Sequence, residues 1–235
     1  MTILTHHSDG VLTITLNRPE AGNALNPALG EALSAELARA VSDDTVRVLI
    51  VTGAGEKIFC AGMDLKAFAA GENVAPVGRA LQQLASFPKP VIAAVNGHAL
   101  AGGFEVMMKC DLVVVAEHAR LGIPEVKRGL VAAGGGTRLT RRIPLQVALE
   151  MGLTGEPISA QRALELGLVN RVVPAADVVS SAFGFFEPNL VRKLWEQGTA
   201  VESARASARR YGAACAEWGR SRYGTFSGIE QLAEI

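Results

Sequence analysis

The stretch PKPVIAAVNGHALAGGFE, residues 88–105, decides the fold class of this chain. Its apolar run at 91–95 follows a proline signal and has no polar residue within it. Such a run predicts a strand that is covered on both faces, as strands of parallel sheets are. The Gly-rich turn at 96–103 then leads into a helical stretch that reaches Cys110. We therefore expect a buried strand, a tight turn and a helix in succession.

The same alternation of strand and helix extends outward in both directions. Other predicted strands lie at 11–16, 46–52, 112–116 and 169–173. Asn26 and Pro27 are a favourable N-cap and first helical residue, and the helix after them is expected to bury Leu29, Leu33, Leu37 and Val41. Further helices are expected before Ser86, after 134–136, between Ser159 and Gly167, and at 200–218. The order predicts an α/β fold with a mostly parallel sheet at 1–175, followed by a C-terminal helical region at 176–235.

Composition excludes several classes of protein. Lys plus Arg and Asp plus Glu both number 23, so the net charge is zero, whereas nucleic-acid binders usually carry a basic excess. The longest apolar stretch, 90–104, is too short and too interrupted to span a membrane. The N-terminus shows no secretory signal pattern. We expect a cytoplasmic enzyme in which Cys60, Cys110 and Cys215 are reduced thiols that pack in the interior.

Two Gly-rich turns are candidates for chemistry. In FCAGMDL, residues 59–65, the glycine before Met63 permits a bend that leaves the Met63 N–H free. In the turn at 96–103, the free N–H groups at the start of the following helix would also suit a developing negative charge. Two such turns can supply the two donors of an oxyanion hole. The alternative is that both turns serve close packing alone.

Two carboxylates stand in apolar surroundings. Glu105 lies one turn into an otherwise apolar helix, and Glu125 follows Pro124 in LGIPEV. An unpaired buried charge is costly, and catalytic groups with shifted pKa values occupy such environments. The alternatives are a carboxylate that favours a helix N-terminus for Glu105 and a solvated loop charge for Glu125. Spacing alone does not show that the two meet.

Motifs for other chemistries are missing from the sequence. Gly53-Ala-Gly55 does not continue into a dinucleotide-binding GxGxxG pattern. There is no GxSxG elbow, no P-loop and no His/Cys set with metal-ligand spacing. His98 is expected to brace its turn and not to take part in catalysis.

At these turns and glutamates the sequence resembles the enoyl-CoA hydratase/isomerase (crotonase) family. The resemblance runs from about residue 3 to 175. It rests on NRPE (17–20), ALN (24–26), FCAGMDLK (59–66), PKPVIAAVNG (88–97), GGFE (102–105), CD (110–111), GIPE (122–125), GL (129–130), GG (135–136) and GLVN (167–170). Each motif alone is modest, but their shared order and spacing are specific.

The resemblance implies a repeated ββα spiral core and an acyl-CoA thioester substrate, with no metal and no cofactor beyond the coenzyme A of the substrate. It implies that Glu105 and Glu125 are the catalytic acid/base pair and that the N–H groups of Met63 and Gly102 form the oxyanion hole. Residues implied to contact the substrate are Ala24, Ala61, Asp64, Leu65 and Lys66. The family also implies a homotrimer or a hexamer built as a dimer of trimers.

Three positions depart from the family pattern. Gly22 stands where an arginine near the CoA moiety is common, and Val131-Ala132 replaces the usual Pro-Gly in the loop after Glu125. The segment after Ala182 is shorter and more irregular than the family's long helices, so we expect looser assembly than in typical relatives.

Three functions compete at this point. Glutamates at both positions favour an enoyl-CoA hydratase, which adds water to a 2-enoyl-CoA. An isomerase that shifts a 3-enoyl-CoA to the 2-enoyl form would need only one carboxylate. A non-catalytic CoA-binding protein of the same fold is the third reading.

Overall fold

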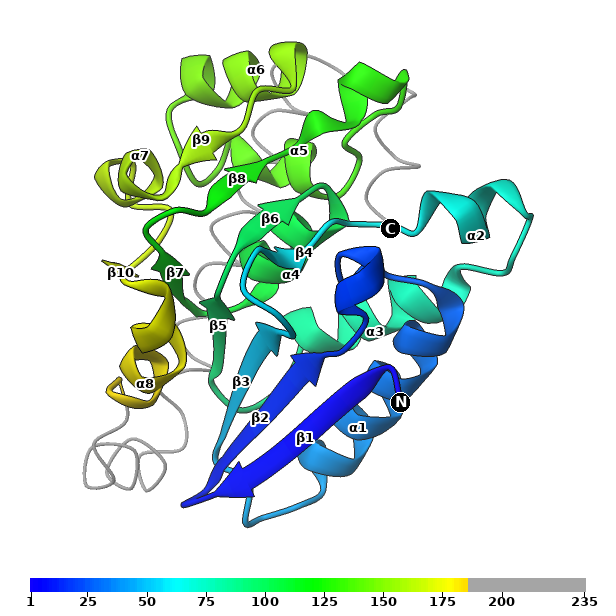
Figure 1. Cartoon of the computed structure of the whole chain (residues 1–235), viewed down its shortest axis with the longest axis vertical. Coiled ribbons are helices and arrows are strands. Elements are labelled where there is room, and N and C mark those ends of the chain that lie inside the picture. Colours follow the sequence, from blue (N-terminus) through cyan, green and yellow to red (C-terminus); the bar gives the residue numbers. More distant parts are fainter. Residues whose placement is uncertain (186–235) are drawn as a thin grey trace, which may run out of the picture. The chain divides into compact units, whose positions relative to one another are not determined.

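The computed structural model describes residues 1–185, which form two sheets and the helices around them (Figure 1). The larger sheet has the order β1-β2-β3-β5-β7-β10. Its strands are β1 (Ile3–Ser8), β2 (Val11–Leu16), β3 (Val48–Gly53), β5 (Val91–Val95), β7 (Leu112–Ala116) and β10 (Arg171–Val173). Only the β1–β2 pairing is antiparallel, so the predicted mostly parallel sheet is confirmed.

The smaller sheet has the order β4-β6-β8-β9 and holds the functional turns. Its strands are β4 (Ile58–Cys60), β6 (His98–Leu100), β8 (Arg120–Gly122) and β9 (Ile158–Ser159). The helices are η1 (Pro19–Ala21), α1 (Pro27–Val41), α2 (Leu65–Ala69), α3 (Ala75–Ala85), α4 (Gly102–Lys109), η2 (Pro124–Arg128), α5 (Gly135–Leu139), α6 (Leu145–Thr154), α7 (Ala160–Glu165), η3 (Ala175–Asp177) and α8 (Val178–Phe183).

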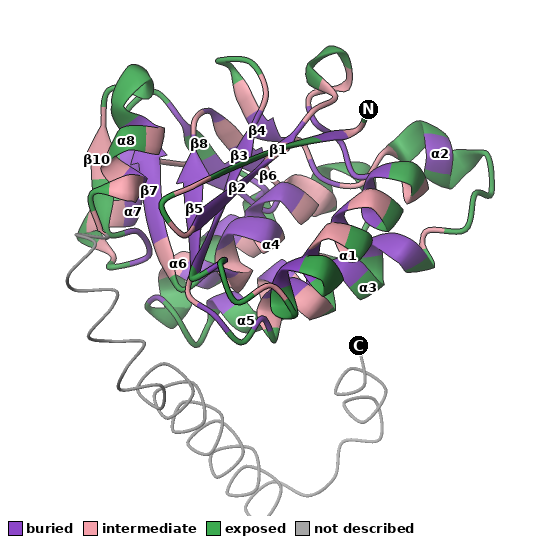
Figure 2. Cartoon of the chain, turned by 90° about the horizontal axis from the view of Figure 1, so that it is seen from below, coloured by how far each residue is buried: buried purple, intermediate pink, exposed green. Residues whose placement is uncertain are grey.

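The chain repeats one unit: a strand in the larger sheet, a strand in the smaller sheet, then a helix. β3, β4 and α2 form one unit, β5, β6 and α4 the next, and β7, β8 and η2 a third (Figure 1). This is the predicted ββα spiral, and it brings the turns after β4, β6 and β8 to one side. The apolar run that predicted a doubly covered strand is β5, which is buried along its whole length (Figure 2).

Helix α1 begins as predicted, with the Asn26 side chain accepting a hydrogen bond from the Leu29 N–H. Its buried face includes Leu29, Leu33 and Leu37. The prediction for Val41 was wrong: Val41 is 44% exposed, and Ala40 is buried in its place. A period of 3.6 residues drifts from a strict four-residue step, so by the third step the core-facing position has moved back by one residue.

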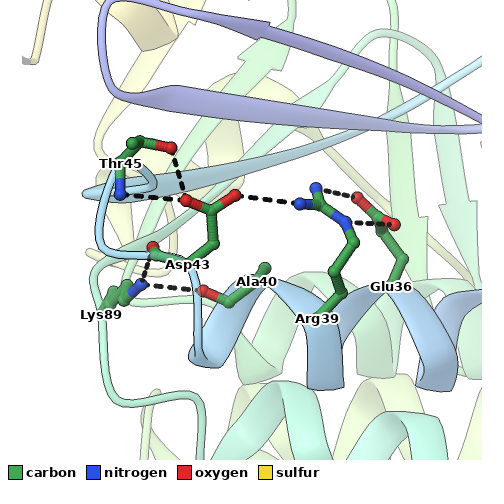
Figure 3. A network of polar contacts seen from close by, with 6 residues as sticks. All are labelled: Glu36, Arg39, Ala40, Asp43, Thr45 and Lys89. Carbon is green, nitrogen blue, oxygen red and sulfur yellow. Dashed lines mark hydrogen bonds and ion pairs between the residues drawn. The ribbon is translucent and has the colours of Figure 1, made fainter.

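The end of α1 is fixed by a lysine that sequence reasoning treated as part of a chain break. Lys89 is 3% exposed, and its Nζ donates to the Ala40 and Asp43 carbonyl oxygens at 2.8 and 2.7 Å (Figure 3). The Ala40 carbonyl lies in the last turn of α1 and the Asp43 carbonyl just beyond it, where backbone acceptors lack helical partners. Lys89 therefore joins α1 to the entrance of β5.

The C-terminal part is described only as far as α8, which packs against β5 and β7. The predicted helix at 200–218 lies outside the described residues. No helix within residues 1–185 is long and apolar enough to cross a membrane.

Candidate active site

The structure brings Glu105 and Glu125 to the same site although twenty positions separate them in sequence. Glu105 lies in the first turn of α4 and Glu125 in the first turn of η2. Their carboxylates are close enough for the charge of Glu105 to raise the pKa of Glu125. The two neighbouring strands β6 and β8 lead into these helices, which explains the convergence.

The surroundings of Glu125 favour its protonated form. Burial raises its pKa above the ordinary value, and the charge of Glu105 raises it further against the lowering effect of its own backbone N–H. Its Oε2 atom is buried and has no hydrogen-bond partner among the described residues. A buried carboxylate oxygen without a hydrogen-bond partner favours the neutral form of the carboxyl, because burial penalises charge.

Glu105 is instead held as an acceptor. Its Oε1 accepts a hydrogen bond of 2.8 Å from the Gly135 N–H at the start of α5. The Gly135 N–H thus fixes the position of one carboxylate oxygen of Glu105. The two glutamates therefore differ in their surroundings, because one accepts a backbone hydrogen bond and the other has a pKa that burial raises.

The two Gly-rich turns converge beside this pair. Gly62 has φ +100°, so the bend predicted before Met63 is confirmed. A Cβ placed on Gly102 would lie 3.4 Å from the Met63 N, which puts the two turns in contact. Within residues 1–185 no hydrogen bond uses the N–H of Met63 or of Gly102. The two turns thus offer two unused N–H donors close together, and donors of this kind can stabilise a developing negative charge.

Sequence reasoning missed Ala101, which lies just before Gly102. Its backbone has φ 50° and ψ −125°, a conformation that is costly for a residue with a Cβ. Such strain persists where the surroundings enforce it and is concentrated at functional sites. No residue type in the sequence marks it, because alanine gives no signal for positive φ.

A groove of about 430 Å³ opens next to Met63, between η1 and the start of α2. It is lined by Arg18, Glu20, Ala21, Ala24, Met63, Asp64, Leu65 and Lys66. Four of the expected substrate contacts, Ala24, Asp64, Leu65 and Lys66, are thus brought together. Ala61 is not among the lining residues; its N–H donates to the Gly22 carbonyl at 2.9 Å.

Arg18 was not singled out, although it belongs to the NRPE motif. Its Nη1 donates to the Ala24 carbonyl at 2.6 Å and pairs with Asp64 Oδ2 at 2.9 Å. Asp64 also caps α2 by accepting from the Lys66 and Ala67 N–H groups. Burial raises the pKa of Asp64, but Arg18 and these N–H groups outweigh burial and lower it overall. Arg18 therefore ties the two walls of the groove together.

His98 lies in strand β6 and not in the turn where it was predicted, and it braces the smaller sheet. Its Nδ1 accepts a hydrogen bond of 3.1 Å from the Arg120 N–H, which links β6 to β8. Burial lowers its pKa, and His118 and Arg120 lower it further.

Within residues 1–185, the cysteines and the remaining ionisable groups form no second candidate site. Cys60 and Cys110 are buried thiols outside any disulfide, as predicted, and burial raises the pKa of the Cys60 thiol to about 12. Cys215 lies outside the described residues. Up to residue 185, no group of three or more His, Cys, Asp or Glu side chains is placed to hold a metal ion.

Comparisons of sequence and of structure with known proteins identify the same family. A sequence profile described as enoyl-CoA hydratase/isomerase matches residues 6–209. A carnitinyl-CoA dehydratase of Salmonella typhi is 44% identical over 178 residues, which cover 73% of this chain and 68% of that protein. The solved structure of an enoyl-CoA hydratase from Mycobacterium tuberculosis H37Rv is 45% identical, with a TM-score of 0.72, over 78% of this chain and 73% of that chain. A carnitinyl-CoA hydratase structure from Mycobacterium avium is 39% identical, with a TM-score of 0.76, over 100% and 91% of the two chains.

Proposed function

Because the chain belongs to the enoyl-CoA hydratase/isomerase family, we propose that it is a hydro-lyase acting on coenzyme-A thioesters. The reaction is the addition of water across the 2,3 double bond of a 2-enoyl-CoA, which gives a 3-hydroxyacyl-CoA. Relatives named as hydratases and dehydratases support this reaction class.

The observation that carries the proposal is the pairing of two glutamates in different surroundings. Glu105 accepts a hydrogen bond from a backbone N–H, whereas burial raises the pKa of Glu125. Addition of water needs a base for the water proton and an acid for the carbon that receives a proton. An isomerase needs one carboxylate only, so the second glutamate favours hydration.

The chemistry then follows from the geometry. The Met63 and Gly102 N–H groups hold the thioester carbonyl oxygen and stabilise the negative charge that develops on it. Glu105 takes a proton from a water molecule as the water oxygen bonds to Cβ. Glu125 gives its proton to Cα, and the net change is the addition of one water.

The groove beside Met63 is proposed to receive the coenzyme-A part of the substrate. Ala24, Asp64, Leu65 and Lys66 line it, and Ala61 lies beyond its lining. Lys66 supplies a positive charge at this end, which suits the phosphates of coenzyme A, whereas the charge of Arg18 is paired with that of Asp64. Coenzyme A enters as part of the substrate, and the proposed steps use no metal and no further cofactor.

A carnitinyl-CoA substrate is a second candidate within the same chemistry, because the Salmonella typhi and Mycobacterium avium relatives carry that name. The reaction would then be the same addition or loss of water on a different acyl group.

Incubation with crotonyl-CoA tests the proposal, with loss of the enoyl-thioester absorbance as the readout. Parallel incubations with carnitinyl-CoA and with a 3-enoyl-CoA identify the acyl group and the reaction. Hydration of crotonyl-CoA or dehydration of carnitinyl-CoA is the expected result. Conversion of the 3-enoyl-CoA alone would indicate an isomerase, and binding without turnover of any of the three would indicate a non-catalytic CoA-binding protein.

Assembly as a homotrimer or hexamer belongs to the proposal as well. Leu145, Leu149 and Leu153 lie one helical turn apart on α6 and are exposed in the single chain, and assembly is driven by burial of such surface. Light scattering at micromolar concentration tests the assembly. A cytoplasmic location is proposed with it, and cell fractionation is its test.

A further inference from the structure

One segment touches both carboxylates of the site. It begins at Glu125 in η2 and ends at Gly135 in α5, where the Gly135 N–H donates to Glu105 Oε1 at 2.8 Å. Near the start of the segment, the Leu130 N–H donates a hydrogen bond of 3.1 Å to the Glu125 carbonyl and so forms a turn. A single loop thus carries the acid at one end and a contact with the base at the other.

Gly134 is in direct contact with the Glu105 carboxylate. A Cβ added to Gly134 would overlap the Cδ and both carboxylate oxygens of Glu105. The backbone of Gly134 has φ −85° and ψ −55°, which any residue adopts readily. Glycine is therefore required at this position for space and not for its conformational freedom.

Hydrogen bonds within the loop hold the backbone around Gly134 in its conformation. The Ala133 N–H donates to the Val131 carbonyl and the Gly136 N–H to the Ala132 carbonyl, both at 2.9 Å. Thr137 Oγ1 donates to the Ala133 carbonyl at 2.6 Å. These bonds on both sides of Gly134 mean that a larger residue there would displace the Glu105 side chain in preference to the backbone.

We infer that Gly134 and Gly135 are positioning residues that hold the Glu105 carboxylate in the orientation needed for water addition. The Gly135 N–H fixes Oε1, and the missing side chain of Gly134 leaves room for the carboxylate beside Glu125. The inference rests on the proposed function for its kinetic consequence, but the contact itself does not depend on it. Val131 and Ala132, which depart from the family pattern, lie inside this same loop.

Replacement Gly134→Ala tests the inference. Displacement of a reacting group by about 1 Å costs roughly 100-fold in rate, so kcat is expected to fall about 10–100-fold. KM for the acyl-CoA should change less than about twofold, because the replacement does not alter the CoA groove, whose contacts bind the ground state and the transition state equally. Gly152→Ala is the matched control: the added Cβ would meet only Ile123 Cδ1 at 3.9 Å, and kcat should stay at the wild-type value.

The same replacement made in a Glu105→Asp protein distinguishes a loss of positioning from general damage to the fold. Glu105→Asp withdraws the carboxylate by one methylene, which makes room for a methyl group at position 134. In that background Gly134→Ala should lower the remaining activity by less than about threefold, since the two changes are coupled. An equal loss in both backgrounds would overturn the inference.

The crystal structure of the Gly134→Ala protein separates this inference from the proposed function. A displaced Glu105 side chain supports the positioning role even if the wild-type protein hydrates no enoyl-CoA, an outcome that would overturn only the proposed function. A Glu105 carboxylate in its original position, still bonded to the Gly135 N–H, would overturn the positioning role whatever the activity.

Discussion

Replacement of Glu125 by glutamine gives the sharpest expectation for catalysis. Glutamine keeps the shape of the side chain and removes the proton that Glu125 is proposed to deliver. A positioned general acid contributes about 10²–10⁴-fold, which corresponds to about 2.7–5.4 kcal/mol in the barrier. Because Oε2 has no hydrogen-bond partner among the described residues, no neighbour is placed to relay a proton in its stead. We therefore expect a loss of kcat towards the upper end of that range.

The assay is the initial rate of crotonyl-CoA hydration, with acyl-CoA affinity measured separately by calorimetry. Affinity should remain within a few-fold of wild type, since the CoA groove does not include Glu125. Glu117→Gln, at an exposed glutamate in the turn after β7, is the matched control and should leave both quantities unchanged. A Glu125→Gln enzyme with more than about a tenth of the wild-type kcat would refute the assignment of Glu125 as the acid.

The same variant has a consequence for stability. The pKa of Glu125 is raised in the folded protein, so the folded state binds more protons than the unfolded state between the ordinary pKa of 4.5 and the raised value. Wild-type stability is therefore lost as pH rises through this window, and glutamine removes that loss. Urea denaturation at several pH values should show Glu125→Gln gaining stability relative to wild type as pH rises above 4.5, with no gain below it. If Glu125→Gln instead lost stability relative to wild type as pH rises, the raised pKa of Glu125 would be contradicted.

Three further changes test the other parts of the site and the fold. Gly102→Pro removes one proposed oxyanion donor and should cost about 10²–10³-fold in kcat; full activity in a protein with native circular dichroism would exclude the donor role. Arg18→Met breaks the ion pair with Asp64 and should raise KM about 5–10-fold, which corresponds to a loss of about 1–1.4 kcal/mol, with kcat nearly unchanged; an unaltered KM would show that the tie across the groove does not matter for binding. Lys89→Met removes the Lys89 donor from the buried Ala40 carbonyl and one of two donors from the Asp43 carbonyl, and should lower the free energy of unfolding in urea by about 2–4 kcal/mol. The exposed control Lys57→Met should cost less than about 0.5 kcal/mol; a loss no larger than in the control would contradict the role drawn in Figure 3.

The alternation of strands and helices could be read from the sequence because each element carries its own local pattern. The apolar run at Val91–Val95 and the cap formed by Asn26 needed no knowledge of the rest of the chain. Position within a long helix was less secure: Val41 is exposed because a four-residue step overshoots the true helical period.

Contacts between elements could not be read in the same way. Lys89 and Arg18 are ordinary basic residues in sequence, and only the fold shows that one closes α1 and the other joins the walls of the groove. The sequence also gives no sign of the strained backbone of Ala101 or of the contact of Gly134 with Glu105, since neither depends on a residue type that marks it. The two glutamates were found because carboxylates in apolar surroundings are unusual, but their meeting came from the adjacent strands β6 and β8.

Reaction in water enriched in oxygen-18 tests hydration by the two glutamates most directly. With crotonyl-CoA or another 2-enoyl-CoA as substrate, mass spectrometry should find one oxygen-18 atom in a 3-hydroxyacyl-CoA product. Its rate of appearance should fall by at least about 100-fold in Glu105→Gln and in Glu125→Gln, because each removes one proton-transfer group. A product that shifts its double bond without gaining oxygen-18, or full incorporation in either variant, would contradict addition of water by this pair.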